Sequence, residues 1–337
     1  HPWVKSNPEW FNKRADGTIA YAENPPKKYQ DIYPINFDND YNAIVAETLR
    51  ILRLWISKGI SIFRVDNPHT KPVHFWAEIM KTIHAESPDV IFLAEAFTKP
   101  SMMHALGKAG FHQSYTYFTW RTSKQELTEY ATEVSQQTSA FFRPNFWVNT
   151  PDILPFHLQS GNPAIFAIRA ALAATLTPSW GMYAGFELYE HRRFKEGGEE
   201  YIDSEKYEIK VRDWEGATKK KLTLAPFITQ LNAIRKKNVA LQRLRNLRFH
   251  ATDNDAIIAY SKRDGDNLIL IVINLDPTFA QETTVHWNMS DLGLQKDNFA
   301  VTDLIDGASY NWSPHTYVRL DPTRLSGKVV HIAQVKL

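Results

Sequence analysis

Residues 59–72, GISIFRVDNPHTKP, decide the fold of this chain. The run opens on a glycine suited to ending a helix, continues as an apolar strand, and turns polar at Arg64 and Asp66. A second run, VIFLAEAFTKP at 90–100, has the same order, with Glu95 after its apolar residues. Continuous apolar strands separated by helices are typical of parallel βα units. The two runs therefore predict a parallel α/β fold.

The same alternation of strands and helices extends along most of the chain. Helices are expected at 41–58, 72–86, 100–107, 123–137, 162–176 and 223–237, and strands at 60–65, 90–94, around SYTYF, 145–149 and 179–183. About five such strands are too few for a closed eight-stranded barrel and acceptable for an open sheet. The pattern alone leaves that choice open.

Three segments of the chain do not follow this strand–helix alternation. Residues 1–40 hold several prolines among aromatics and amides, which predicts an ordered but irregular excursion. Residues 187–221 form a charged insertion. Beyond Leu244 come short β-runs, and Asp264-Gly265 is a strong hairpin signal. We expect an α/β part over 41–243 and an antiparallel β-sandwich over 244–337.

The composition excludes several classes of protein. The 337 residues are 43% hydrophobic, which is ample for a large core, and the formal net charge is only +2. That charge argues against nucleic acid as the main ligand, and the longest apolar stretches are too short to span a membrane. With no cysteine, disulfides and thiolate metal sites are impossible, which fits a reducing compartment. The 10 Trp, 14 Tyr and 19 Phe suit stacking on sugars, and equally an ordinary core.

Three acids come just after apolar strands: Asp66, Glu95 and Asp152. The carboxyl ends of barrel strands converge on one mouth, so these acids can meet there despite their separation in sequence. Retaining glycosyl transfer needs such a pair, a nucleophile and an acid–base about 5 Å away. Arg64, two residues before Asp66, points to the same face and favours the ionised carboxylate. The alternative for each acid is a purely structural role, as a helix cap or as one partner of an ion pair in a loop.

Other chemistry finds little support in the sequence. His69, His74 and His157 lack metal-ligand spacing, so we interpret them as structural or surface histidines and predict no metal. No glycine-rich nucleotide loop is present, and no cofactor is expected. Lys27 and Lys28, in ENPPKKYQD, have the charge to hold an anion, although a solvated loop is the commoner role for such lysines.

At these residues the chain resembles the α-amylase superfamily of retaining α-glycosidases and transglycosidases, glycoside hydrolase family thirteen. GISIFRVDNPHTKP, VIFLAEAFTKP and FWVNTPDIL look like its strand-four, strand-five and strand-seven motifs. The strings AENPPKKYQDIYPINFD and NTPDILP look more narrowly like the bacterial maltosyltransferases that use α-maltose 1-phosphate to extend α-1,4-glucans. The likeness runs from residue 1 to at least 240, and more weakly beyond.

The resemblance implies a role for individual residues. Asp66 would be the nucleophile that forms a β-maltosyl-enzyme, Glu95 the acid and base, and Asp152 the residue that stabilises the distorted sugar. The phosphate-binding positions match Asn24, Lys27, Tyr29 and Asn67, and the donor-sugar positions match Lys206 and Tyr207. A phosphate leaving group needs donors and positive charge near the mouth, which is consistent with the NPPKKY loop. The resemblance further implies a cytoplasmic homodimer.

Two departures from the superfamily matter. Common amylases have a histidine just before the strand-seven acid. This chain has Pro151 there, and the maltosyltransferases it resembles also have a proline. The strand-three motif and earlier strands are not in the sequence, so the chain is expected to begin inside the insertion after strand three and to supply strands four to eight of a (β/α)8 barrel. An incomplete barrel leaves open edges, so we expect a fragment that folds poorly alone.

Two rival functions stay open beside maltosyl transfer. An α-glucan hydrolase would release reducing sugar to water and be indifferent to phosphate. An inactive, glucan-binding or scaffolding piece would keep the acids without turnover.

Overall fold

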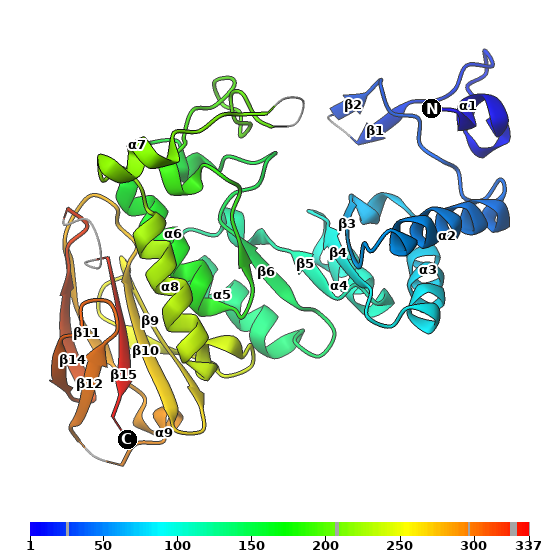
Figure 1. Cartoon of the computed structure of the whole chain (residues 1–337). Coiled ribbons are helices and arrows are strands. Elements are labelled where there is room, and N and C mark those ends of the chain that lie inside the picture. Colours follow the sequence, from blue (N-terminus) through cyan, green and yellow to red (C-terminus); the bar gives the residue numbers. More distant parts are fainter. Residues whose placement is uncertain (25–26, 206–208, 296, 324–328, 337) are drawn as a thin grey trace. The chain divides into compact units, whose positions relative to one another are not determined.

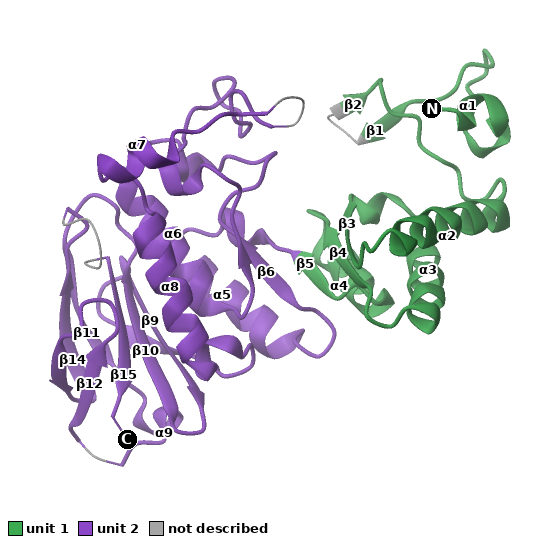
Figure 2. Cartoon of the chain, viewed as in Figure 1, with its two compact units in different colours: residues 1–114 green, residues 115–337 purple. Residues whose placement is uncertain are grey.

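A computed structural model of the chain describes residues 1–24, 27–205, 209–295, 297–323 and 329–336 (Figure 1). The chain divides into two compact units, residues 1–114 and residues 115–337 (Figure 2). None of the described helices is both long and apolar enough to cross a membrane.

The first unit is built from the predicted βα alternation. It holds α1 (Trp3–Ser6), the antiparallel pair β1 (Ala22–Asn24) and β2 (Lys27–Tyr29), α2 (Tyr41–Ser57), β3 (Ile62–Asp66), α3 (Val73–Glu86), β4 (Ile91–Glu95) and α4 (Pro100–Ala109), and β5 (Gln113–Tyr115) lies at its boundary. Strands β3 and β4 are parallel, and β5 pairs parallel with β4. The parallel arrangement predicted from the apolar runs is thereby confirmed.

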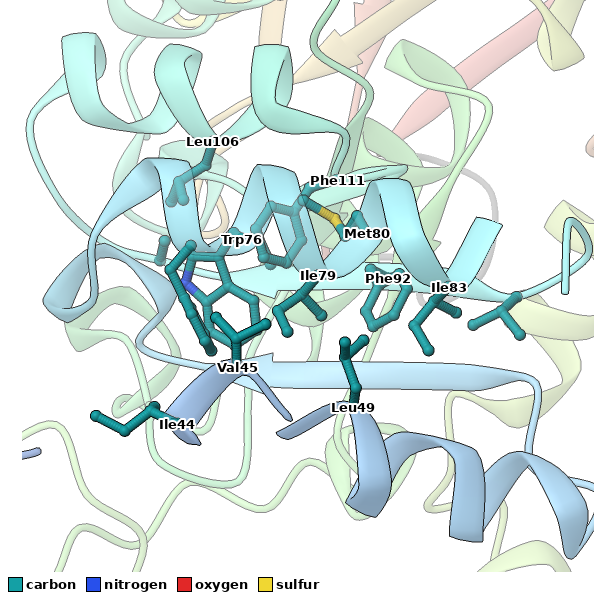
Figure 3. Packing of buried hydrophobic residues seen from close by; sticks show 14 of the residues in the cluster. Ile44, Val45, Leu49, Trp76, Ile79, Met80, Ile83, Phe92, Leu106 and Phe111 are labelled. Carbon is teal, nitrogen blue, oxygen red and sulfur yellow. The ribbon is translucent and has the colours of Figure 1, made fainter. Parts of the chain in front are cut away.

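Helices α2 and α3 pack their apolar faces onto the strands of this unit (Figure 3). The labelled core residues are Ile44, Val45 and Leu49 of α2, Trp76, Ile79, Met80 and Ile83 of α3, Phe92 of β4, and Leu106 and Phe111. Phe92, Ile79 and Ile83 are completely buried. A large-to-small change at such a position typically costs about 3–5 kcal/mol for Phe. This core fixes β3 and β4 side by side.

The sequence sets the ends of α2 as expected. Asp40 caps the start of the helix, because its carboxylate accepts a hydrogen bond from the Ala43 N–H. The Trp10 indole also donates to Asp40, at 3.3 Å, which ties the N-terminal segment to the cap. Gly59 ends the helix with φ at +90°, a conformation that favours glycine.

Strand β3 shows strict alternation between two environments. Phe63 and Val65 pack against the helix-covered core. Ile62, Arg64 and Asp66 point the other way and are exposed, Ile62 with 56% of its surface. The side-chain period of two in a strand explains why Arg64 and Asp66 share a face, as the sequence predicted.

The α/β part of the second unit has two parallel strands and several helices. It comprises α5 (Lys124–Thr132), β6 (Pro144–Trp147), α6 (Pro163–Leu176), β7 (Trp180–Gly181), α7 (Trp214–Lys219) and α8 (Ala225–Lys237). Every residue of α6 after Pro163 is buried, as expected of a helix that is apolar all round. The predicted strand at SYTYF ends early, at Tyr115, and a 3-10 helix follows at Tyr117–Trp120.

The early end of that strand has a physical reason. Arg169, fully buried in α6, donates to the main-chain oxygens of Phe118 and Arg121 and stacks 4.0 Å over the Phe118 ring. These contacts hold the main chain in its turn, where an extended strand would have paired. The predicted polar helix at 123–137 is likewise divided, with α5 followed by a π-helix at Glu133–Gln137.

The rest of the second unit is one antiparallel sheet of eight strands. These are β8 (Leu247–Thr252), β9 (Ile257–Asp264), β10 (Asn267–Asn274), β11 (Gln281–His286), β12 (Phe299–Asp303), β13 (Ser309–Trp312), β14 (His315–Leu320) and β15 (Val330–Val335), in the order β13-β12-β15-β10-β9-β8-β11-β14, and α9 (Met289–Leu292) follows β11. The predicted hairpin at Asp264-Gly265 joins β9 to β10, with Gly265 at φ +59°. An antiparallel C-terminal domain is thereby confirmed.

Strand β9 buries a lysine that the sequence did not single out. Lys262 is 0% exposed and donates to the main-chain oxygen of Leu176, at the end of α6. Burial, with the nearby charge of Arg235, lowers the pKa of Lys262 to about 7. Because this pKa lies below the ordinary value of a lysine, the unfolded chain binds the proton more tightly than the folded one. The folded state therefore loses stability as the pH falls from about 10 to about 7.

We predict that Lys262→Met stabilises the fold. Methionine fills a similar volume without a buried amine, so the free energy of unfolding near pH 7 should rise by about 1–3 kcal/mol. The gain should be smaller near pH 10, where the lysine is neutral in both states. Urea unfolding at the two pH values measures this, with Lys336→Met, at an exposed position after β15, as the control. An equal effect at both pH values would contradict the prediction.

Candidate functional site

Asp66 and Glu95 meet at the carboxyl ends of two neighbouring strands. Each is the last residue of its strand, where the sequence had placed it one position beyond. The parallel register pairs Asp66 directly with Glu95. Neighbouring strands lie about 4.8 Å apart, so the two carboxyl groups start from main-chain positions at that spacing.

Arg64 forms an ion pair with both acids. Its Nη1 lies 3.7 Å from Asp66 Oδ1, and its Nη2 lies 3.6 Å from Glu95 Oε2. The two acids differ in their surroundings, because the Asp66 side chain is 68% exposed and the Glu95 side chain only 9%. One guanidinium therefore links an open carboxylate to a buried one.

Burial raises the pKa of Glu95 to about 7, which is the largest influence on this group. The positive charge of Arg64 opposes the rise, and a hydrogen bond with Asp66 and its negative charge add to it. A carboxyl group with a pKa near 7 can both give and take a proton at neutral pH, as a general acid–base must.

We predict that Asp66→Asn lowers the pKa of Glu95 and that Arg64→Met raises it further. The first change removes a negative neighbour and the second removes a positive one. NMR titration of a carboxyl-labelled glutamate at position 95 would measure both shifts. Glu78→Gln, an exposed substitution on α3, serves as the control and should leave the titration unchanged. Shifts of the same sign in both variants would contradict this account of the site.

The turn after β3 is held against both acids. Asn67 has φ at +46°, in the left-handed region that few residues other than glycine adopt. Its N–H donates to the main-chain oxygen of Glu95, at 3.0 Å, and its Nδ2 donates to Asp66 Oδ1, also at 3.0 Å. The amide that the resemblance assigns to phosphate therefore lies directly beside the proposed nucleophile.

Asp152 belongs to the second unit, in the loop after β6. The strand ends at Trp147, so Asp152 comes five residues beyond it rather than three, and its side chain is exposed. Its N–H donates to Thr150 Oγ1 at 3.2 Å. The loop is anchored by Asn149, which is completely buried.

The anchoring of this loop is one feature that the sequence did not reveal. Asn149 Nδ2 donates to the Tyr201 hydroxyl at 2.7 Å, and Asn149 Oδ1 accepts from the Tyr183 N–H at 2.8 Å. One buried amide therefore joins the strand-seven motif to the charged insertion. The "NT" of NTPDILP was the only signal for it.

Inside the insertion, a buried guanidinium organises the charged side chains. Arg212 donates to Glu190 at 2.8 Å and to Glu205 at 3.0 Å, and its guanidinium lies 5.5 Å from the Tyr183 ring centre. Lys210 makes a further ion pair with Glu190 at 3.0 Å. Lys206 and Tyr207, which the resemblance assigns to the donor sugar, lie outside the described residues.

The residues assigned to phosphate in the first unit lie on the hairpin of β1 and β2. The register pairs Asn24 with Lys27, and Ala22 with Tyr29. The side chains of Asn24 and Lys27 lie outside the described part of the chain. Lys28, exposed, is 3.8 Å from Glu23. The hairpin thus collects three of the four assigned positions, and Asn67 is the fourth.

The described residues contain no group of three or more His, Cys, Asp or Glu side chains that could hold a metal ion. His157 is largely buried, and burial, with the charge of Arg169, lowers its pKa to about 2. His69 is half-buried beside the site, and burial also lowers its pKa. The structure thus brings Arg64, Asp66, Asn67 and Glu95 into one cluster.

Proteins with a similar sequence include several maltosyltransferases. Residues 249–335 match the family described as "GLGE, C-terminal". An α-1,4-glucan:maltose-1-phosphate maltosyltransferase of Streptomyces coelicolor is 57% identical over 98% of this chain and 50% of its own length. A protein of the same name from Mycobacterium tuberculosis is 50% identical over 99% of this chain and 48% of its own length. The chain spans about half the length of the curated relatives it matches.

Solved structures with a similar fold include several α-amylases. A maltogenic α-amylase from Thermotoga neapolitana has a TM-score of 0.72 at 15% identity. The match covers 99% of this chain and 74% of the amylase. An α-amylase from Geobacillus thermoleovorans, complexed with acarbose, has a TM-score of 0.72 at 17% identity. The match covers 100% of this chain and 74% of the amylase. These likenesses confirm the predicted fold class, a parallel α/β part followed by an antiparallel domain. The resemblance predicted from the sequence is confirmed as well: this chain is homologous to about half of an α-1,4-glucan:maltose-1-phosphate maltosyltransferase.

Proposed function

We propose that this chain carries the catalytic acids of a retaining maltosyltransferase, which moves a maltosyl group from α-maltose 1-phosphate to the non-reducing 4-hydroxyl of an α-1,4-glucan. The observation that carries the proposal is the in-register pair of Asp66 and Glu95, linked by Arg64. Retaining enzymes keep their two carboxyl groups about 5–5.5 Å apart, and inverting enzymes about 6.5–9.5 Å. Adjacent strand ends favour the shorter spacing.

In the first step of the proposed reaction, an Asp66 carboxylate oxygen attacks the anomeric carbon and the bond to the phosphate oxygen breaks. Glu95 gives its proton to the departing phosphate, and a β-maltosyl-enzyme remains. In the second step, Glu95 takes the proton of the acceptor 4-hydroxyl, whose oxygen displaces Asp66 and restores the α-linkage. The pKa of about 7 for Glu95 supports both roles. The exposure of Asp66 supports its role as nucleophile.

The remaining assignments complete the proposed site. Asp152 stabilises the positive charge that develops on the sugar ring, and Lys206 and Tyr207 contact the donor sugar. Asn24, Lys27, Tyr29 and Asn67 hold the phosphate. The position of Asn67 supports the phosphate assignment, because its side-chain amide donates to Asp66 and so lies beside the proposed nucleophile. A charged leaving group gains most from such fixed donors.

The proposal extends to the rest of the protein. We infer that the chain supplies strands four to eight of a (β/α)8 barrel, from 41–243, after an insertion at 1–40, with 244–337 as the C-terminal domain. The exposed apolar side chains on the face of β3, such as Ile62, support an additional layer or strand there. The same proposal includes a cytoplasmic homodimer, as the resemblance implies. The absence of cysteine is consistent with the reducing compartment and does not bear on the dimer.

The decisive experiment measures phosphate release from α-maltose 1-phosphate, with and without maltooligosaccharide. The proposed transferase releases phosphate only when acceptor is present and lengthens the glucan by two glucose units. A hydrolase would release reducing sugar without acceptor, and a binding protein would release neither. Either of these results would overturn the proposal.

We predict that Asp66→Ala and Glu95→Gln each reduce this release by at least about a thousandfold, because each removes a group that forms or breaks bonds. Glu78→Gln, on the outer face of α3, is the matched control and should keep full activity. Full activity in either acid variant would exclude that residue from the mechanism.

We further predict that Lys27→Ala weakens use of the phosphate donor much more than binding of long glucans. The lysine is assigned to the leaving group and not to the acceptor, so KM for the donor should rise by about tenfold. Lys28→Ala, the neighbouring exposed lysine, is the control. Equal effects on donor and glucan would remove the phosphate role of Lys27.

A further inference from the structure

We propose that Lys71 is a positioning residue for this reaction: its ammonium group holds the main-chain turn on which Asp66 and Asn67 are presented. This inference rests on the proposed function and adds to it a residue to which no role has been assigned. Lys71 lies five residues after Asp66 and folds back beneath the turn.

The contacts of Lys71 are with main-chain oxygens. Its Nζ lies 3.3 Å from the oxygen of Asp66 and 3.2 Å from the oxygen of Asn67. One ammonium group therefore binds two successive carbonyl groups, at the point where β3 ends. Ammonium groups offer three donors, which makes a double contact of this kind possible.

The turn needs such donors because of its geometry. Asn67 is in the left-handed conformation, which costs about 1 kcal/mol or more for a residue other than glycine. The strand ladder ends at Asp66, and the Asn67 oxygen is bonded within the turn, where it accepts from the Thr70 N–H at 3.1 Å. Besides Lys71, the Thr70 hydroxyl donates to the same oxygen, at 2.8 Å. Trp76 donates in the same way to the oxygen of Pro68, at 3.0 Å.

The surroundings of Lys71 show that its place in the turn is not that of a solvated surface lysine. Lys71 is partly buried, and burial lowers its pKa, against the attraction of the Asp66 carboxylate. Both of its hydrogen bonds go to carbonyl groups rather than to a carboxylate. Partial burial of the ammonium group costs hydration free energy, and the two hydrogen bonds to carbonyl oxygens offset this cost.

Misplacement of the turn would reach the chemistry directly. The Asn67 N–H bonds to the oxygen of Glu95, and its side-chain amide bonds to Asp66. A rotation about the main chain at Asn67 therefore moves the amide away from the nucleophile and loosens the link between the two strand ends. Displacements of about 1 Å in a catalytic site reduce rates by up to about a hundredfold.

The test compares Lys71→Met and Lys71→Arg with Lys81→Met, an exposed lysine change on α3. In the phosphate-release assay on the intact protein, Lys71→Met should lower kcat by about 10–100-fold and also raise KM for the donor, because Asn67 is assigned to the phosphate, while KM for the glucan acceptor changes by less than about threefold. Lys71→Arg should recover most of the loss, because a guanidinium also reaches two carbonyl oxygens. Unchanged kcat in Lys71→Met, or a similar loss in Lys81→Met, would overturn the proposal.

A second measurement does not depend on activity. Amide hydrogen exchange at Asn67 should become at least about tenfold faster in Lys71→Met, while the amides of α3 keep their protection. Exchange at Asn67 that stays at the wild-type rate would overturn the role of Lys71. If the wild-type protein releases no phosphate but exchange at Asn67 responds, the proposed function is wrong and the hold of Lys71 on the turn stands.

Discussion

The parallel pairing of β3 with β4 is the constraint on which the site depends. It places Asp66 opposite Glu95, residue for residue, and its register is set by the core beneath, where Phe92 and Ile79 are completely buried. A shift of one residue would turn Arg64 and Asp66 toward the helices and send Phe63 and Val65 to the open face. The apolar core therefore determines which side chains reach the strand ends, and the chemistry follows from it.

Two carboxyl groups of the same kind acquire different properties from their surroundings. Asp66 is exposed to solvent, whereas Glu95 is enclosed, and its pKa rises toward neutrality. Pairs of acids whose environments separate their proton affinities are typical of acid–base assignments in enzymes.

The sequence predicts those features that depend on local period and composition. The order of strands and helices in the first unit, the shared face of Arg64 and Asp66, and the hairpin at Asp264-Gly265 all follow from such patterns. It does not predict contacts between distant residues. The buried Arg169 that ends the strand at SYTYF, the link from Asn149 to Tyr201 and the burial of Lys262 all depend on partners at least 48 residues away.

The guanidinium shared by the two acids has a consequence for timing. When Asp66 forms its ester with the sugar in the proposed reaction, its negative charge disappears, and Arg64 is left to act on Glu95 alone. One of the influences that raised the proton affinity of Glu95, the negative charge of Asp66, is removed when Glu95 has just given its proton away, while burial and the opposing attraction of Arg64 remain. The proton affinity of Glu95 is thereby lowered while the ester awaits the acceptor. The same three side chains thus form a cycle in which the covalent step itself converts the acid into the base.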